Sequence, residues 1–151
     1  MASPAPGILG AVEARFPQVV TGLTGGLWLG QVPEQIPDPS GSGTVRTPLP
    51  CGCLKHLGEQ TEWTFEDAYV DEGAVAFVLF ERGAAAVEAL AKQVRDGFAK
   101  NWGLIQVQGG EVVSFLRTRY LVDAEEERAA DGEQVYRAEV EYQYRVTGTI
   151  P

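Results

Sequence analysis

The sequence predicts an α+β domain, in which one mostly antiparallel sheet carries two packed helices and ends in a long C-terminal β-hairpin. Apolar and polar residues alternate from Val135 to Val146, which is typical of a strand with one buried and one solvated face. Residues 84–98 instead place apolar side chains at the spacing of a helix. Helices that occur among antiparallel strands favour a sheet with helices against it.

Two elements are expected before residue 33, after a flexible N-terminus of residues 1–6. Residues 7–16 predict a helix that ends at Pro17, because proline interrupts helical hydrogen bonding. After a glycine-rich turn, residues 27–32 predict a strand. The apolar residues at helical spacing in the first segment are Ile8, Leu9, Val12 and Phe16.

Residues 33–50 predict a long loop without regular secondary structure. The stretch contains five prolines and the glycine- and serine-rich run 40–43. Loops of this length inside compact domains are usually functional or disordered. Because helix and strand patterns lie on both sides of the loop, the chain 1–151 is interpreted as a single domain.

The middle of the chain predicts further strands. Residues 49–57 form one candidate, which Gly58 ends, and residues 61–70 form another. Residues 71–73 predict a turn. Residues 74–80 are apolar at every position, which is typical of a central strand covered on both faces.

The second helix is expected to begin after Gly83. Glu88 and Lys92 have the favourable i, i+4 spacing on its polar side, and Gly103 marks a natural stop. Its apolar stripe consists of Ala84, Val87, Leu90, Ala91, Val94 and Phe98.

Residues 111–122 and 135–146 predict the two strands of the final hairpin, and the charged connection between them predicts a tip in solvent. Arg117 and Arg119 are expected on one face of the first strand, alternating with Val113 and Phe115. There they would pair with acids of the last strand, the simplest interpretation, or with acids of a neighbouring subunit.

Composition limits the classes of partner. The chain has 12 Lys and Arg against 21 Asp and Glu, a net charge of −9. This balance argues against a surface that grips nucleic acid or docks on anionic lipid. No apolar run approaches the ~20 residues of a membrane span, and the N-terminus does not have the pattern of a secretion signal.

The residues that usually carry catalysis or bind metals are sparse. His56 is the single histidine and is expected to be structural, while Cys51 and Cys53 are expected to be reduced, half-buried thiols on one side of a strand. No glycine-rich stretch has the spacing of a phosphate-binding loop. We therefore expect no catalytic, cofactor or metal site.

Acidic and aromatic clusters allow binding interpretations that their surroundings disfavour. The acids of residues 123–133 do not have calcium-loop spacing, so a solvated hairpin tip is favoured. Several aromatic residues are surrounded by acids, which favours core or subunit contact over nucleic-acid stacking. They are Trp63, Phe65, Tyr136, Tyr142 and Tyr144.

The order of the segments resembles the tail terminator and tail-completion proteins of tailed bacteriophages, including related minor tail proteins of prophages and gene transfer agents. The resemblance covers about residues 8–147 and is one of pattern and order; the long loop 33–50 departs from it. The segments that carry it are the helix from Ile8, Leu49–Leu54, Trp63–Phe65, Val75–Phe80, Ala84–Phe98, Val112–Arg117 and Tyr136–Val146.

The resemblance implies a structural virion protein without catalysis. Such proteins form a ring, typically a hexamer, on the tail tube, stop its polymerisation and meet the head-side connector. Genomic DNA passes through the lumen without specific binding. The implied location is the tail–neck region of the virion, after assembly in the host cytoplasm.

The hairpin tip and the proline-rich loop are expected to make the subunit or ring contacts, with the two strand arginines. These residues are Ile36, Val45, Arg46, Arg117, Arg119, Glu125, Glu126, Glu127 and Arg128.

Two alternative functions are kept open. Another neck component, a head-closure or connector-completion protein, would have the same size and acidity. A cytosolic ligand-binding domain would instead have a closed pocket between sheet and helix, lined by Trp28, Trp63 and Tyr142.

Overall fold

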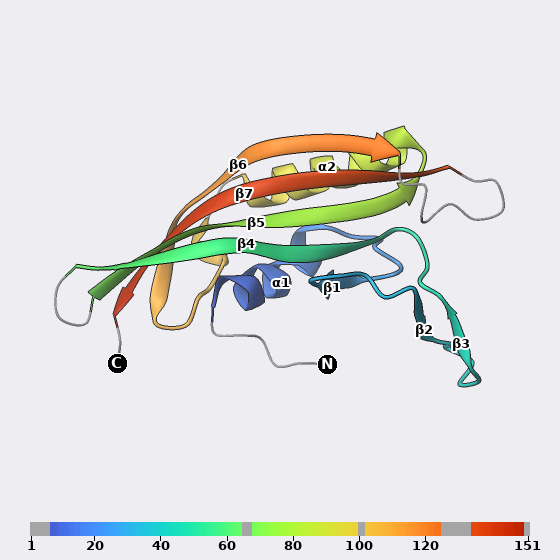
Figure 1. Cartoon of the computed structure of the whole chain (residues 1–151), viewed down its shortest axis with the longest axis horizontal. Helices are drawn as coiled ribbons and strands as arrows, with labels where there is room; N and C mark the ends of the chain where they lie inside the picture. The colour runs from blue at the N-terminus through green and yellow to red at the C-terminus, as the bar shows by residue number, and fades with distance from the viewer. Residues whose placement is uncertain (1–6, 65–67, 100–101, 125–133, 150–151) are drawn as a thin grey trace.

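The computed structural model describes residues 7–64, 68–99, 102–124 and 134–149 (Figure 1). Two α-helices lie in the described part, α1 (Ile8–Val19) and α2 (Ala84–Phe98), with a short 3₁₀ helix η1 (Trp102–Leu104). The strands are β1 (Leu27–Leu29), β2 (Gln35–Pro37), β3 (Thr44–Arg46), β4 (Cys51–Trp63), β5 (Ala68–Arg82), β6 (Gly110–Ala124) and β7 (Val135–Thr149). Neither described α-helix is both long and apolar enough to cross a membrane.

The main sheet has the strand order β1-β4-β5-β7-β6. Short β1 runs parallel to β4, and every other neighbouring pair is antiparallel. The sheet ends in the β6–β7 hairpin, whose strands are each 15 residues long. The structure therefore confirms the α+β class and the long C-terminal hairpin.

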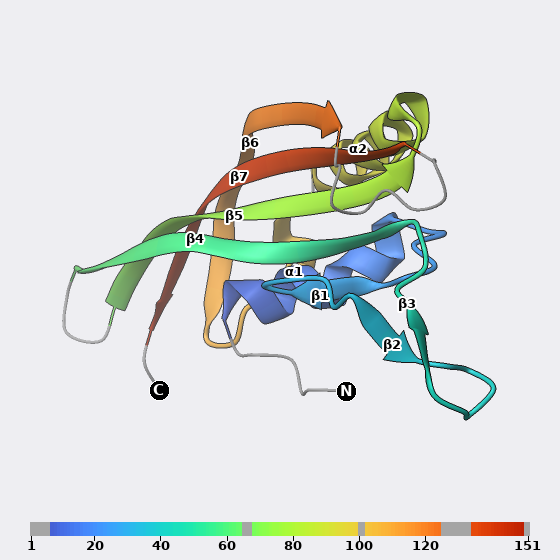
Figure 2. The same cartoon turned by 45° about the vertical axis from the view of Figure 1, so that its right-hand side comes forward.

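Both helices pack on one face of the sheet, which we call the helix face; the other is the open face (Figures 1 and 2). The core between them is aromatic. The ring centroids of Phe115 and Tyr142 lie 4.5 Å apart, and those of Phe77 and Phe98 lie 5.3 Å apart. The buried residues of α2 are Val87, Leu90, Ala91, Val94 and Phe98, which confirms the predicted stripe.

Strand β5 is central, as the apolar run predicts. Its alternate residues Val75, Phe77 and Leu79 enter the core on the helix face, whereas Val78 and Phe80 enter a smaller apolar cluster on the open face. The other buried members of that cluster are Val32, Cys51, Cys53 and Val135. Cys51 and Cys53 thus lie on one face, as expected, but they are fully buried rather than half-buried.

The prediction that residues 33–50 contain no regular element is wrong. Strands β2 and β3 pair as an antiparallel hairpin. Its turn is closed by Asp38, whose carboxylate accepts from Ser40 N–H at 2.9 Å and whose carbonyl accepts from Gly41 N–H at 2.9 Å. Three-residue strands between prolines are too short to show a period of two, so the pattern could not reveal them.

Two predicted chain breaks in the middle of the sequence are also absent. Strand β4 continues past Gly58 through a bulge, and β5 continues through residues 71–73 without a turn. Gly73 is present because the Gly58 carbonyl and the Tyr144 side chain both approach it closely: an added Cβ would lie 2.3 Å from the Gly58 carbonyl oxygen and 2.5 Å from the Tyr144 hydroxyl oxygen. The glycine allows close packing between strands instead of turning the chain.

The first two elements differ from prediction only at their ends. Helix α1 passes Pro17 and ends at Val19, and Val20 N–H donates to Phe16 O at 2.9 Å. Strand β1 ends at Leu29, earlier than the predicted residue 32.

Candidate assembly surfaces

The paired strands β4 and β5 extend beyond the helices at one end of the sheet, and we call their outer parts, residues 58–63 and 68–73, the arm (Figure 1). The β6–β7 hairpin ends at the opposite side. Trp63, at the outer end of β4, is 56% exposed and packs edge-on against Tyr69, with ring centroids 5.9 Å apart. Apolar surface is therefore displayed at the tip of this arm, where a partner can reach it.

Two tyrosines brace the arm by lying across glycines of the neighbouring strand. Tyr144 spans Gly73, and Tyr69 lies over Gly148, where an added Cβ would be 2.5 Å from the Tyr69 hydroxyl oxygen. An aromatic ring over a cross-strand glycine covers backbone that would otherwise be bare. The arm is therefore a packed extension of the sheet.

A polar network anchors Tyr144 to β4. Its hydroxyl donates to Glu59 Oε2 at 2.7 Å and lies 2.8 Å from His56 Nε2. Burial, together with the hydrogen bond to the Glu59 carboxylate, raises the pKa of the Tyr144 phenol well above its ordinary value. His56, the single histidine, thus belongs to a network that fixes the base of the arm.

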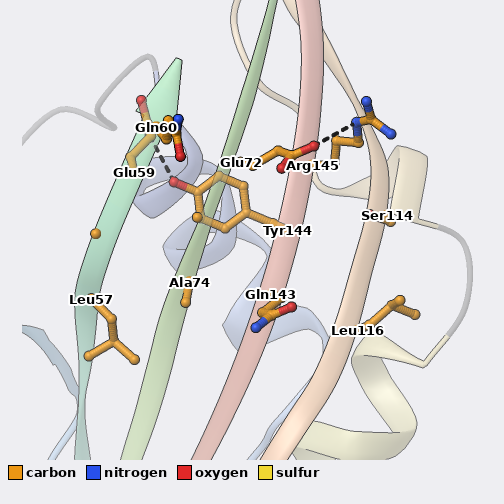
Figure 3. A pocket seen from close by; sticks show the side chains of 12 residues that line it. Leu57, Glu59, Gln60, Glu72, Ala74, Ser114, Leu116, Gln143, Tyr144 and Arg145 are labelled. Atoms are coloured by element: carbon orange, nitrogen blue, oxygen red, sulfur yellow. Dashed lines mark hydrogen bonds and ion pairs between the residues drawn. The ribbon is translucent and has the colours of Figure 1, made fainter. Parts of the chain in front are cut away.

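The open face carries a hollow of about 610 Å³ at the same place (Figure 3). Two rows of residues cross four strands there in register. One row is Gly58, Ala74, Gln143 and Leu116; the other is Gln60, Glu72, Arg145 and Ser114. Leu57 and Leu116 are 47% and 55% exposed at its sides, and Arg145 Nε lies 3.2 Å from Glu72 Oε1.

The prediction that Arg117 and Arg119 share a face is wrong. Strand β6 has irregularities at Val113 and at Thr118, and each extra residue reverses the alternation of side chains. Arg117 consequently lies opposite Tyr142 on the helix face, whereas Arg119 lies opposite Glu141 on the open face, with Nη1 to Oε1 at 3.9 Å. The expected pairing with an acid of the last strand is therefore present for Arg119 alone of these two.

Positive charge gathers in a groove between α2 and β6. Lys92, Arg95 and Arg117 line it together with Tyr120, and its volume is about 340 Å³. The Arg117 guanidinium carbon lies 5.6 Å from the centroid of the Tyr120 ring. Burial, then the nearby Glu88 carboxylate, raises the pKa of Tyr120. The chain as a whole has a net charge of −9, so this groove is a local patch of positive charge on an acidic protein.

The structure brings the predicted loop contacts together. Ile36 lies opposite Val45 in the β2–β3 pair, and Arg46 lies opposite Gln35. Ile36 and Val45 are half-buried and Arg46 is exposed. The predicted tip contacts Glu125, Glu126, Glu127 and Arg128 lie outside the described residues.

The pocket expected for a ligand-binding domain is not formed by its predicted residues. Tyr142 is 2% exposed inside the aromatic core, whereas Trp28 is 37% and Trp63 is 56% exposed. The space between sheet and α2 is filled by packed rings. Among the described residues, no group of histidines, cysteines and acids has an arrangement that could hold a metal ion.

Sequence reasoning missed the tyrosine–glycine pairs and the positive groove. The spacing of Gly73 and Gly148 carries no signal by itself, because the partner tyrosines come from other strands. The groove combines residues of α2 and β6 whose proximity depends on the bulge at Thr118.

No protein-family model matches the sequence, and no curated protein sequence matches it. A solved chain in the virion of a native gene transfer agent (GTA) particle has a similar structure, with a TM-score of 0.51. The two sequences are 17% identical, and the match covers 95% of this chain and 100% of that chain. The similarity therefore spans nearly the whole length of this chain.

Proposed function

We propose that this chain is a structural protein of a phage-like particle and that it forms an oligomeric ring, a tail terminator, on the end of the tail tube. The observation that carries the proposal is the similarity in fold, over nearly the full length of both chains, to a component of a gene transfer agent virion. In this role the protein performs no catalysis. It stops tube growth and presents its other side to the head-side connector.

The shape of the subunit supports an assembly role. Its arm and its final hairpin project at opposite ends of one sheet, so a subunit has contact surfaces in two directions (Figure 1). A head-to-tail contact that closes on itself generates a ring, and six copies are the number we propose. The exposed β2–β3 hairpin, with Ile36, Val45 and Arg46, is proposed to contact the tube or the connector. Deletion of residues 36–46 should then prevent tail attachment.

The charge of the chain suits a channel for DNA. With a net charge of −9, the ring neutralises few phosphates, so genomic DNA passes through without being held. The acidic residues Glu125, Glu126 and Glu127 of the hairpin tip are proposed to face either the lumen or the next ring. The protein acts in the neck of the virion after assembly in the host cytoplasm, with no membrane partner.

Another neck position is the second candidate, because the similar chain is described only as part of a gene transfer agent virion, which leaves its position within the particle open. Deletion of the gene separates the two. Loss of a terminator leaves tubes of uncontrolled length, which negative-stain microscopy measures directly. Loss of a connector component leaves tails of normal length that are detached from heads. Normal, complete particles after deletion would reject both.

A further inference from the structure

Strand β4 has an open edge over most of its length. In the part of the chain that the structure describes, β4 pairs beyond Leu54 with β5 alone, because its other neighbour, β1, reaches only Gly52, Cys53 and Leu54. From His56 to Trp63 every residue of β4 is exposed. The backbone groups of Lys55–Trp63 that point away from β5 are therefore available to another strand.

Strand β6 is the opposite edge of the same sheet, and no strand among the described residues pairs with its outer side. Its residues from Leu116 to Tyr120 are all exposed. In the strand order β4, β5, β7, β6, each neighbouring pair is antiparallel, so β4 and β6 run in opposite directions. A second copy placed beside the first would therefore continue the sheet by antiparallel pairing of β4 with the neighbour's β6.

The charges select this pairing over a two-fold one. The middle residue of the open β4 segment is Glu59, and the middle residue of β6 is Arg117. Full overlap of two β4 edges about a two-fold axis places Glu59 opposite its own copy, and two β6 edges do the same for Arg117. Like charges directly opposite destabilise a sheet. Full overlap of β4 with β6 instead places Glu59 opposite Arg117.

The irregular positions also coincide in that register. The bulge of β4 lies between His56 and Gly58, and one of the two irregularities of β6 lies between Arg117 and Arg119. The other, at Val113, lies opposite Trp63 at the end of the open β4 segment. The bulges at Leu57 and Thr118 each add one residue on the same side of the Glu59–Arg117 pair, so the alternation of faces stays matched from Lys55 to Glu62. Gln60 then lies opposite Leu116, with both side chains on the open face.

We infer that copies of this chain join head to tail through the β4 edge, Lys55–Trp63, and the β6 edge of the next copy, with Glu59 opposite Arg117. The inference rests on the proposed ring and specifies its interface. One sheet then runs from subunit to subunit, and the arm of each copy lies against the hairpin of the next.

Engineered disulfides test the register. In one molecule Gln60 and Leu116 are separated by β5 and β7, about 14 Å of sheet, which is too far for a disulfide. In the inferred interface they are directly opposite, within disulfide reach. The native cysteines are buried. Full-length Q60C/L116C protein, oxidised at its highest soluble concentration, should give a ladder of covalent oligomers on non-reducing gels.

The single variants provide the matched controls. Q60C alone and L116C alone should give no cross-link, whereas a mixture of the two should give a covalent dimer and nothing larger. A dimer from Q60C alone would show that two β4 edges pair about a two-fold axis at Gln60, and it would overturn the inference. A Q60C/L116C double variant that does not cross-link would also overturn the inference. Arg117→Glu, made in the protein that carries only its two native cysteines, should weaken self-association by about tenfold as measured by sedimentation.

The inference and the proposed function fail in different ways. A Q60C/L116C ladder from a chain whose deletion leaves particles unchanged would reject the virion role and keep the edge interface. Particles that contain a ring of this chain but whose Q60C/L116C form does not cross-link on oxidation would keep the role and reject the interface.

Discussion

Removing the hydroxyl from Tyr144 should destabilise the protein, whereas removing it from Tyr142, two residues earlier on β7, should not. The Tyr142 hydroxyl is buried and has no hydrogen-bond partner among the described residues. The Tyr144 hydroxyl donates to the Glu59 carboxylate at 2.7 Å. Both substitutions, Tyr142→Phe and Tyr144→Phe, remove the same atom from side chains that point to the same face.

The magnitudes follow from hydrogen bonding. Tyr144→Phe loses a hydrogen bond to a charged group, which is worth about 1.5–3 kcal/mol. The Glu59 side chain is 34% exposed, so water compensates in part and about 1–2 kcal/mol of destabilisation is expected. Tyr142→Phe removes a buried polar group that has no partner, so the free energy of unfolding should stay unchanged or rise by up to about 1 kcal/mol.

Urea and thermal unfolding followed by circular dichroism would measure both variants. Each kcal/mol corresponds to a shift in Tm of about 2–4 °C for a domain of this size. The reasoning is refuted if Tyr142→Phe destabilises the protein as much as Tyr144→Phe does. It is equally refuted if Tyr144→Phe has no effect, because the network with Glu59 and His56 would then contribute nothing to the arm.

Three further predictions concern pH, packing and register. Burial raises the pKa of Tyr142 from 10.0 to about 12, so the folded state holds this proton more tightly than the unfolded state does. The free energy of unfolding should therefore be constant below pH 10 and fall towards pH 12 by up to about 1.4 kcal/mol per pH unit. Tyr142→Phe should reduce this loss in alkaline unfolding curves. Gly73→Ala should cost about 1–3 kcal/mol through its clash with Tyr144, whereas Gly103→Ala, which meets no atom within 4 Å, should be nearly neutral in the same denaturation assay. Val112→Ala should cost about 2 kcal/mol and Val113→Ala under about 0.5 kcal/mol, because Val112 is 4% and Val113 is 40% exposed; equal losses would place the β6 bulge elsewhere.

The sequence predicted the elements whose periodicity is long and regular. The alternation from Tyr136 to Val146 indicated which face of β7 is buried, and the α2 stripe indicated which residues enter the core, because both patterns persist over many residues. The apolar run 74–80 likewise predicted the central position of β5.

Apart from the β2–β3 hairpin, whose strands are too short to show a period, the failures share one physical cause: single residues were interpreted without their spatial neighbours. Gly58 and Gly73 have the appearance of breaks, yet one lies at a bulge and the other makes room for Tyr144. The bulge at Thr118 reverses the face of Arg119 and has no signature in the sequence. The open edge of β4 likewise becomes visible only once β1 is seen to end at Leu29.

The central claim is that this chain forms a ring at the end of a tail tube, and cryo-electron microscopy of purified particles tests it most directly. The account predicts a closed ring of this chain between the tube and the head-side connector, with neighbouring sheets joined edge to edge. A particle in which the chain is absent, or in which it lies away from the neck as an isolated subunit, would contradict the account.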